Sequence, residues 1–290
     1  MLWFNLYWTS ILTLACVYAI AAVGLQMILA SGQFSVMQAA VMACGAYGSA
    51  YAELTWHVSF TVALIAGAIV GAATGAVTAL VLLRLSGLFF GIATLALGQA
   101  CYYLVQVIPG LGGPGGLAGV NLSTTPNLAL GTLVVVVVVY AAARRHSAYA
   151  RVLAAGADPV AAEALAIDPW RVRLVAFTCG SALAGLAGGL YVHYVGLVQP
   201  PDLSFGAESL LLIYVVAGGI QTPFGAVLGA IGVSVLLELL RASDQDRYWM
   251  LGAILVIVTL LRPQGLLWRR RLRARSYWTV VVRRVRAATS

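Results

Sequence analysis

The sequence predicts an all-α protein that crosses a membrane several times. Of its 290 residues, 62% are hydrophobic and only 9% are charged, and the mean hydropathy is +0.95. A soluble domain carries about 25% charged residues, so this chain needs an apolar solvent around most of its surface. Apolar runs of about 20 residues, long enough to span a bilayer as a helix, recur along it. We therefore expect a polytopic membrane helix bundle of about eight membrane helices.

The apolar runs place these helices in order. The run 210–240 is interrupted by Gly218, Gly219 and Pro223. We interpret it as a half-helix, a turn at membrane depth and a longer returning helix, with the broken or re-entrant segment near 208–222, because irregular backbone is tolerated at that depth only under protein or water. The uninterrupted runs lie at about 10–30, 35–55, 58–83, 88–108, 128–143, 173–196 and 248–262.

The arginines set the expected orientation. The net charge is +8, and the basic residues, all of them arginine, are concentrated at 144–173 and 262–286. Such clusters outside apolar spans mark cytoplasmic segments, and a basic groove for nucleic acid is not indicated. We expect a membrane domain over 1–268 with a cytoplasmic loop at 144–172, followed by an Arg-rich cytoplasmic tail at 269–290. The turn near Glu53 and the loops 109–127 and 197–207 then face outward.

Small residues predict close helix packing, because lipid supplies little hydrophobic drive between helices and small faces let backbones approach. Such residues recur at a spacing of four in three rows: Gly67, Gly71 and Gly75; Ser181, Gly185 and Gly189; and Gly225 with Gly229. This pattern indicates a packed bundle without specifying its function.

Enzyme chemistry is not indicated. The three histidines stand at no metal-ligand spacing with a cysteine or carboxylate, and neither G-x-S-x-G nor H-E-x-x-H occurs. The four cysteines form no C-x-x-C pair, so we expect packing thiols. The glycine-rich loop 110–119 lacks the G-K-[ST] ending of a phosphate loop. It is either a tight external turn or a compact loop lining an outer vestibule. We expect no metal and no cofactor in this chain.

The segment 144–172 is the only long polar insertion between the predicted spans. Asp158 can cap a helix whose first residue is Pro159, and Asp168, which precedes a second proline, can end it. We expect a short helix over about 159–167, which either lies in the headgroups or docks on a cytoplasmic partner. The candidate docking residues are Asp158, Pro159, Ala162, Glu163, Leu165, Ile167 and Asp168.

Polar side chains at membrane depth are costly, so each is a candidate for a solute pathway. For the glutamines the simpler alternative is hydrogen bonding between helices. Glu53, His57 and Glu208 lie near span ends, where a position at the membrane–water boundary would explain them. No relay of acidic and basic residues crosses the bilayer, which argues against ion coupling. The candidates at depth are Gln33, Gln38, Thr94, Gln99, Gln106, His193 and Glu208.

Six segments together carry a family resemblance: SGQFSVMQAAVMACGAYGSAYA (31–52), GLFFGIATLALGQ (87–99), GGPGGLAGV (112–120), AAEALAIDPWRVRLVAFTCGSALAGLAGGLYVHYVGLVQP (161–200), VVAGGIQTPFGAVLGA (215–230) and LRPQGLL (261–267). In these segments the chain resembles the integral-membrane permease subunits of branched-chain amino acid ABC importers. The GGPxGL-type external loop is similar to that of the second permease of a pair, through Gly112, Gly113, Pro114 and Gly116.

The resemblance implies a transmembrane permease subunit in the bacterial plasma (inner) membrane that forms half of a solute pathway. It implies a second homologous permease subunit, two cytoplasmic ATP-binding subunits that hold ATP-Mg, and an extracytoplasmic solute-binding protein. The 159–167 helix would be the coupling helix, and the solute a branched-chain or other amino acid. The alternative is a stand-alone channel or secondary transporter for a small polar solute such as urea or an amide.

Overall fold

The computed structural model describes residues 2–85, 87–145, 168–220, 222–240 and 252. Over these residues the protein is mostly helical, and its only strands are two of two residues each, which confirms the predicted all-α bundle. The eight α-helices described are α1 (Leu2–Ala30), α2 (Gln38–Trp56), α3 (Phe60–Leu82), α4 (Leu88–Val107), α5 (Pro126–Arg145), α8 (Pro169–Val195), α9 (Phe205–Gly218) and α10 (Pro223–Leu239). The predicted span at 248–262 and the tail at 269–290 lie outside the described residues.

Five of the described helices are long and apolar enough to cross a membrane: α1, α3, α4, α5 and α8. The pair α9 and α10 is bent by 119° at a short break, so it is either a broken sixth span or a re-entrant loop. The run predicted at 35–55 corresponds to helix α2, which follows a segment without regular structure at 33–37 and is not among these five. Most of its residues are buried among neighbouring helices, so it does not need the strongly apolar surface that lipid demands.

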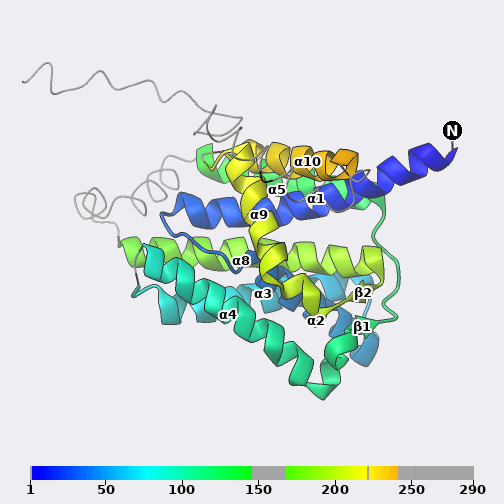
Figure 1. The fold of residues 1–290 in the computed structure, drawn as a ribbon, viewed down its shortest axis with the longest axis horizontal. Coiled ribbons are helices and arrows are strands. Elements are labelled where there is room, and N and C mark those ends of the chain that lie inside the picture. Colours follow the sequence, from blue (N-terminus) through cyan, green and yellow to red (C-terminus); the bar gives the residue numbers. More distant parts are fainter. Residues whose placement is uncertain (1, 86, 146–167, 221, 241–251, 253–290) are drawn as a thin grey trace, which may run out of the picture.

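The short strands mark one end of the bundle. Strand β1 (Leu117–Ala118) pairs antiparallel with β2 (Leu197–Val198), which joins the loop after α4 to the loop after α8. We call this the β end. The N-terminus of α1 lies toward the same end (Figure 1), and the Tyr7 hydroxyl of α1 donates a hydrogen bond to Glu238 of α10 there. The helix that follows the break therefore returns to the end at which the chain begins, as predicted.

The predicted small-residue rows meet at the centre of the bundle. A Cβ added at Gly67 would lie 2.8 Å from the Gly45 carbonyl oxygen of α2 and 3.2 Å from the Gly185 carbonyl oxygen of α8. A Cβ at Gly71 would lie 2.6 Å from the Ser181 carbonyl oxygen. Helices α2, α3 and α8 thus touch backbone to backbone, which is how helices pack tightly without a hydrophobic effect between them.

A second close contact joins the two halves of the broken span. Helix α9 ends at Gly218, and Gly219 adopts φ +113°, a backbone conformation that favours glycine. Thr222 then caps α10 by accepting a hydrogen bond from the Gly225 amide at 3.1 Å, and Pro223 occupies its first position. A Cβ on Gly225 would lie 2.6 Å from the Gly219 carbonyl oxygen. The break is therefore a built turn closed by backbone contact.

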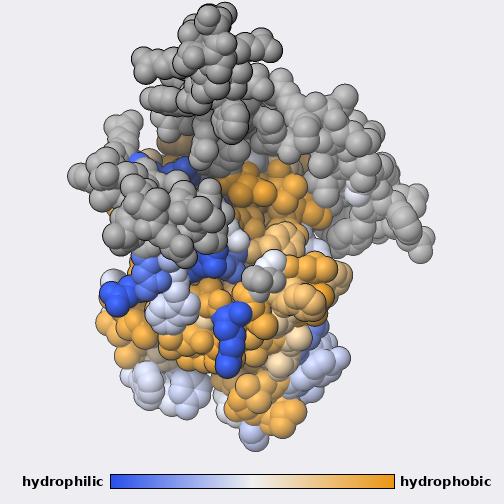
Figure 2. All heavy atoms as spheres, turned by 90° about the vertical axis from the view of Figure 1, so that its left-hand side faces the viewer, coloured by the Kyte–Doolittle hydropathy of each residue, from blue (hydrophilic) through white to orange (hydrophobic). Residues whose placement is uncertain are grey.

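The surface fits a membrane environment. Large apolar side chains on α3, α4 and α5 face outward, including Ile69, Val77, Phe89 and Val139. Figure 2 shows the end opposite the β end, where hydrophobic residues cover much of the described surface and hydrophilic ones gather in a few groups. Apolar surface of this extent is stable in lipid and unstable in water.

Candidate solute cavity

A cavity lies inside the bundle next to the β end. It contains about 460 Å³ of space not filled by protein atoms, part of which is open to the surroundings. Five elements and the strand β2 bring its walls together from positions far apart in the sequence. The lining residues are Tyr18, Ala39, Met42, Ala43, Ala46, Tyr191, Val198, Asp202, Ala207, Leu210, Leu211 and Tyr214.

Three tyrosine rings gather at this cavity. Tyr18 of α1 packs against Tyr191 of α8 with ring centroids 6.1 Å apart, and against Tyr214 of α9 at 6.0 Å. The Tyr214 hydroxyl accepts a hydrogen bond from Ser234 of α10 at 3.3 Å. The walls therefore combine aromatic faces with the small and branched apolar side chains of α2 and α9.

Asp202 is the charged residue among the lining residues. It lies in η3 (Pro200–Leu203), a short 3-10 helix between β2 and α9, and one of its carboxylate oxygens accepts a hydrogen bond from the Gln199 amide at 3.0 Å. The other oxygen accepts a longer bond, 3.4 Å, from the Tyr191 hydroxyl. Burial raises the pKa of Asp202, and the bonds from Gln199 and Tyr191 oppose that shift.

A buried contact between a histidine and a carboxylate joins two helices at the β end. His193 of α8 is completely buried, and its Nε2 lies 2.6 Å from Oε2 of Glu53 in α2. Its Nδ1 lies 2.7 Å from the Gly189 carbonyl oxygen, which can only accept, so Nδ1 carries a proton. Glu53 Oε1 accepts hydrogen bonds from the Asn121 side chain at 2.6 Å and amide at 3.3 Å. The network ties α2, α8 and the loop after β1 into one unit.

Glu208 of α9 is a second buried carboxylate. It is 1% exposed, and neither carboxylate oxygen has a hydrogen-bond partner among the described residues. It packs against α4 at Gly98, where an added Cβ would collide with it, and the amide nitrogen of the adjacent Gln99 is likewise unpartnered. Glu53 and Glu208 are both buried inside the protein, whereas His57 is exposed at the end of α2, and the boundary position expected for these three residues stays a prediction.

The predicted pathway residues do not meet in one place, and none of them lines the cavity. The Gln38 amide donates to the Gly180 carbonyl oxygen of α8 at 3.0 Å, which confirms the interhelical alternative for that residue. The Gln106 amide bonds within its own helix, to the Tyr102 carbonyl oxygen at 3.2 Å. The pathway role of Gln33, Gln38, Thr94, Gln99, Gln106 and His193 stays a prediction.

An extended segment at 31–37 enters the bundle between α1 and α2. The Val36 amide donates to Thr94 Oγ1 of α4 at 3.2 Å, and the Thr94 hydroxyl donates to the Gly91 carbonyl oxygen at 2.9 Å. Gln33 is buried in the same segment. Thr94 therefore supplies an acceptor to backbone that lies outside any helix, which explains a polar group at this depth.

The glycine-rich loop forms two short turns, η1 (Pro109–Leu111) and η2 (Gly113–Gly115), and then leads into β1. Gly112, Gly113 and Gly116 have φ of +76°, +58° and +75°, and Pro114 lies within η2. A side chain at Gly116 would collide with the Val198 carbonyl of β2. The loop is thus closed onto the segment that leads to Asp202.

Of the candidate docking residues, only Asp168 belongs to the described part of the chain. Its side chain caps α8 by accepting a hydrogen bond from the Trp170 amide at 3.0 Å, and it lies 3.3 Å from Arg171. Pro169 begins α8, as the second Asp-Pro pair predicts. The candidates Asp158, Pro159, Ala162, Glu163, Leu165 and Ile167 lie outside the described residues.

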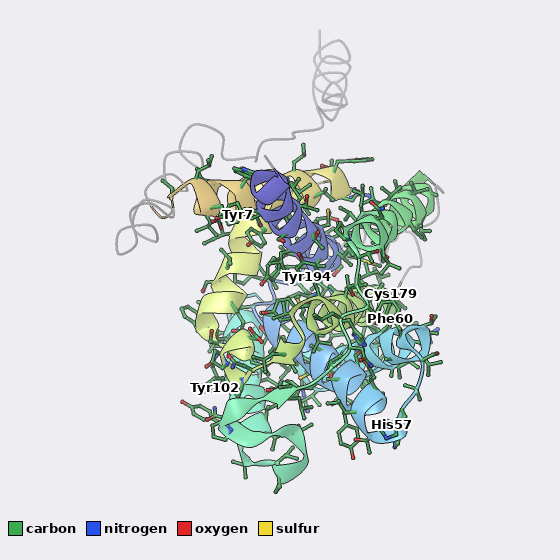
Figure 3. All side chains as sticks on the ribbon, turned by 90° about the vertical axis from the view of Figure 1, so that its right-hand side faces the viewer. Tyr7, His57, Phe60, Tyr102, Cys179 and Tyr194 are labelled. Carbon is green, nitrogen blue, oxygen red and sulfur yellow. The ribbon has the colours of Figure 1, made fainter. Side chains whose placement is uncertain are left out.

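Seen from the β end (Figure 3), Tyr194 at the end of α8 lies near the middle of the bundle, whereas His57 and Tyr102 lie on its periphery. Helix α8 packs directly against α1, α2 and α3. The described residues therefore form a polytopic helical bundle with membrane-length apolar helices and a cavity among them, an architecture that fits a membrane transport component.

The comparison with known proteins gives the particular family. The chain belongs to the family described as branched-chain amino acid transport system / permease component, whose sequence model matches residues 7–261. The family is one of transport permeases, and the chain is a multi-pass protein of the bacterial plasma (inner) membrane.

The relatives are similar over part of their length. Over 110 residues the chain is 38% identical to the high-affinity branched-chain amino acid transport system permease protein LivM of Escherichia coli (strain K12), covering 38% of this chain and 26% of the relative. Over 128 residues it is 31% identical to the corresponding permease protein LivH of Salmonella typhimurium (strain LT2), covering 43% of this chain and 41% of the relative. No solved structure shows a significant match.

Proposed function

We propose that the chain is a transmembrane permease subunit of an ABC importer and forms half of a pathway for branched-chain or other amino acids. The observation that carries this proposal is the cavity at the β end, in a chain that belongs to a transport permease family. Its apolar walls suit aliphatic side chains, while its tyrosines and Asp202 supply polar contacts for the charged end of an amino acid.

The proposed assembly contains three kinds of partner. A second homologous permease subunit would complete the pathway, with this chain as the member that carries the GGPxGL-type loop. Two cytoplasmic ATP-binding subunits would bind ATP-Mg, since no phosphate-loop motif occurs in this sequence. An extracytoplasmic solute-binding protein would deliver the solute at the β end, where the loops 109–125 and 196–204 gather.

In this proposal the segment 158–168 contacts the ATP-binding subunits. Asp168 and Pro169 support this proposal, because they start α8 immediately after the segment. A displacement of the segment would therefore act directly on α8. ATP binding can shift the permease between two conformations only by its differential affinity for them. Because the docking segment is joined to α8, a change in the ATP-binding subunits would reach the membrane helices through it.

The test is co-purification followed by uptake. The chain, expressed with the partner subunits encoded beside it, should co-purify with ATP-binding subunits and take up labelled L-leucine into proteoliposomes only with ATP and the binding protein. Glu163→Arg and Leu165→Asp should abolish uptake while leaving membrane insertion intact. Ala142→Ser, an exposed position on α5, is the control. Uptake by this chain alone, driven by a gradient and indifferent to ATP, would show a channel or secondary transporter instead.

A further inference from the structure

The cavity has a charge that the described part of the protein does not balance. Neither of the two ion pairs found among the described residues includes Asp202. Asp202 is half-buried, and withdrawing a carboxylate from water costs free energy unless a cation or several hydrogen bonds compensate it. Burial raises the pKa of Asp202, as expected for such a group. The site therefore favours a positively charged group brought in from outside.

Asp202 caps η3 and can still accept a hydrogen bond from such a positively charged group. The bond from the Gln199 amide, at 3.0 Å, completes the cap of η3 and uses one oxygen. The other oxygen receives only the 3.4 Å bond from Tyr191. A carboxylate offers about four lone-pair sites, so the oxygen on the tyrosine side can accept a further, charge-assisted bond.

The tyrosine rings also favour a positively charged group in the cavity. At the cavity, the rings of Tyr191 and Tyr214 each lie about 6 Å from the ring of Tyr18. The faces of aromatic rings attract cations, more strongly where water is excluded. Beyond the rings, Met42, Leu210 and neighbouring small side chains give walls that accept an aliphatic group but no charge.

We propose that this cavity is a binding subsite for a primary ammonium group with a branched aliphatic body, in which Asp202 pairs with the ammonium group and the tyrosines surround it. The inference rests on the proposed function, and identifies the ammonium end of the amino acid as the part that this chain recognises. A solute without that group would lack its counter-charge here.

The experiment measures binding of small probes to the assembled transporter in lipid nanodiscs, without the solute-binding protein. The probes are L-leucine, 3-methylbutylamine, which keeps the ammonium group, and 4-methylpentanoate, which keeps only the carboxylate. Affinity is read from tyrosine fluorescence and from thermal stabilisation. The two probes with an ammonium group should bind, and 4-methylpentanoate should bind at least about tenfold more weakly.

Variants of Asp202 then test whether its carboxylate causes the preference for probes with an ammonium group. Asp202→Asn should weaken 3-methylbutylamine binding at least about tenfold and remove the preference over 4-methylpentanoate, whereas Asp202→Glu should retain the preference. Tyr103→Phe, on the exposed face of α4, is the control. Equal affinity of the wild type for the amine and the acid would overturn the proposal, and this comparison needs no variant to fold.

The outcome separates this inference from the proposed function. ATP-dependent leucine uptake by the wild type, with Asp202→Asn binding 3-methylbutylamine as tightly as the wild type, would overturn the subsite and leave the permease role intact. Failure of the wild type to couple uptake to ATP would overturn the permease role, and the binding preference would then be judged on the probes alone.

Discussion

The glycine contact at the centre of the bundle can be tested by adding one methyl group. In Gly71→Ala the new Cβ would lie 2.6 Å from the Ser181 carbonyl oxygen and 2.7 Å from the Gly185 Cα. Both are backbone atoms of α8, so no side chain can rotate away. Ordinary contact begins near 3.4 Å, so the helices must separate by about 0.8 Å at this point.

The expected loss in the free energy of unfolding is about 3 kcal/mol, at the upper end of the range for overpacking in a core. The upper end applies because the displaced groups belong to helices that also contact each other at Gly67 and Gly45, so the separation is passed along the interface. A higher intrinsic helix propensity of alanine returns at most about 1 kcal/mol.

The assay is reversible unfolding of the purified chain in mixed micelles, followed by far-UV circular dichroism. Gly131→Ala on α5 is the matched control, because nothing lies within 4 Å of its added Cβ. We expect it to be neutral or slightly stabilising. Equal stability of the Gly71 and Gly131 variants would show that backbone contact between α3 and α8 is not the source of packing energy.

Three further outcomes can be measured in the same unfolding assay. The His193→Gln variant leaves the buried Glu53 carboxylate without its histidine partner and should lower the free energy of unfolding by about 3–5 kcal/mol. A double-mutant cycle with Glu53→Gln that shows no coupling would contradict this pairing. Glu208→Gln should leave stability unchanged or raise it, because it removes a buried carboxylate that has no hydrogen-bond partner among the described residues, and a loss above about 1 kcal/mol would reveal an unseen partner. Gly116→Ala should destabilise the β end more than Gly119→Ala, because both glycines have positive φ but only the first would collide with β2; equal effects would mean that backbone strain alone decides.

Much of the fold is predictable from the sequence, because lipid imposes simple rules. Apolar run length places the helix ends within a few residues at α3, α4 and α5, and the glycine spacing predicts the face on which α3 meets α8. The interruption before Pro223 predicts the break between α9 and α10. The run at 35–55 predicts α2 equally well, but apolarity alone does not distinguish a helix enclosed by protein from one that faces lipid.

The cavity could not be predicted in the same way. Its walls join Tyr18, Asp202 and Tyr214, which come from different elements, and no local pattern connects them. The pairing of Glu53 with His193 is likewise not predictable from a local pattern, since it depends on the register between α2 and α8. The signal that was available is the presence of carboxylates near apolar spans, which marks them as unusual but does not show what they face.

The two sets of glycine contacts divide the bundle into two bodies with little internal freedom. Sliding α2, α3 and α8 past one another, or α9 past α10, would drive carbonyl groups into neighbouring backbone. The tyrosine-lined cavity lies between these two groups of helices, with Tyr18 of α1 also in its wall. We therefore expect a change in the width of the cavity to move α9 and α10 relative to α2, α3 and α8, rather than to shift helices within either group.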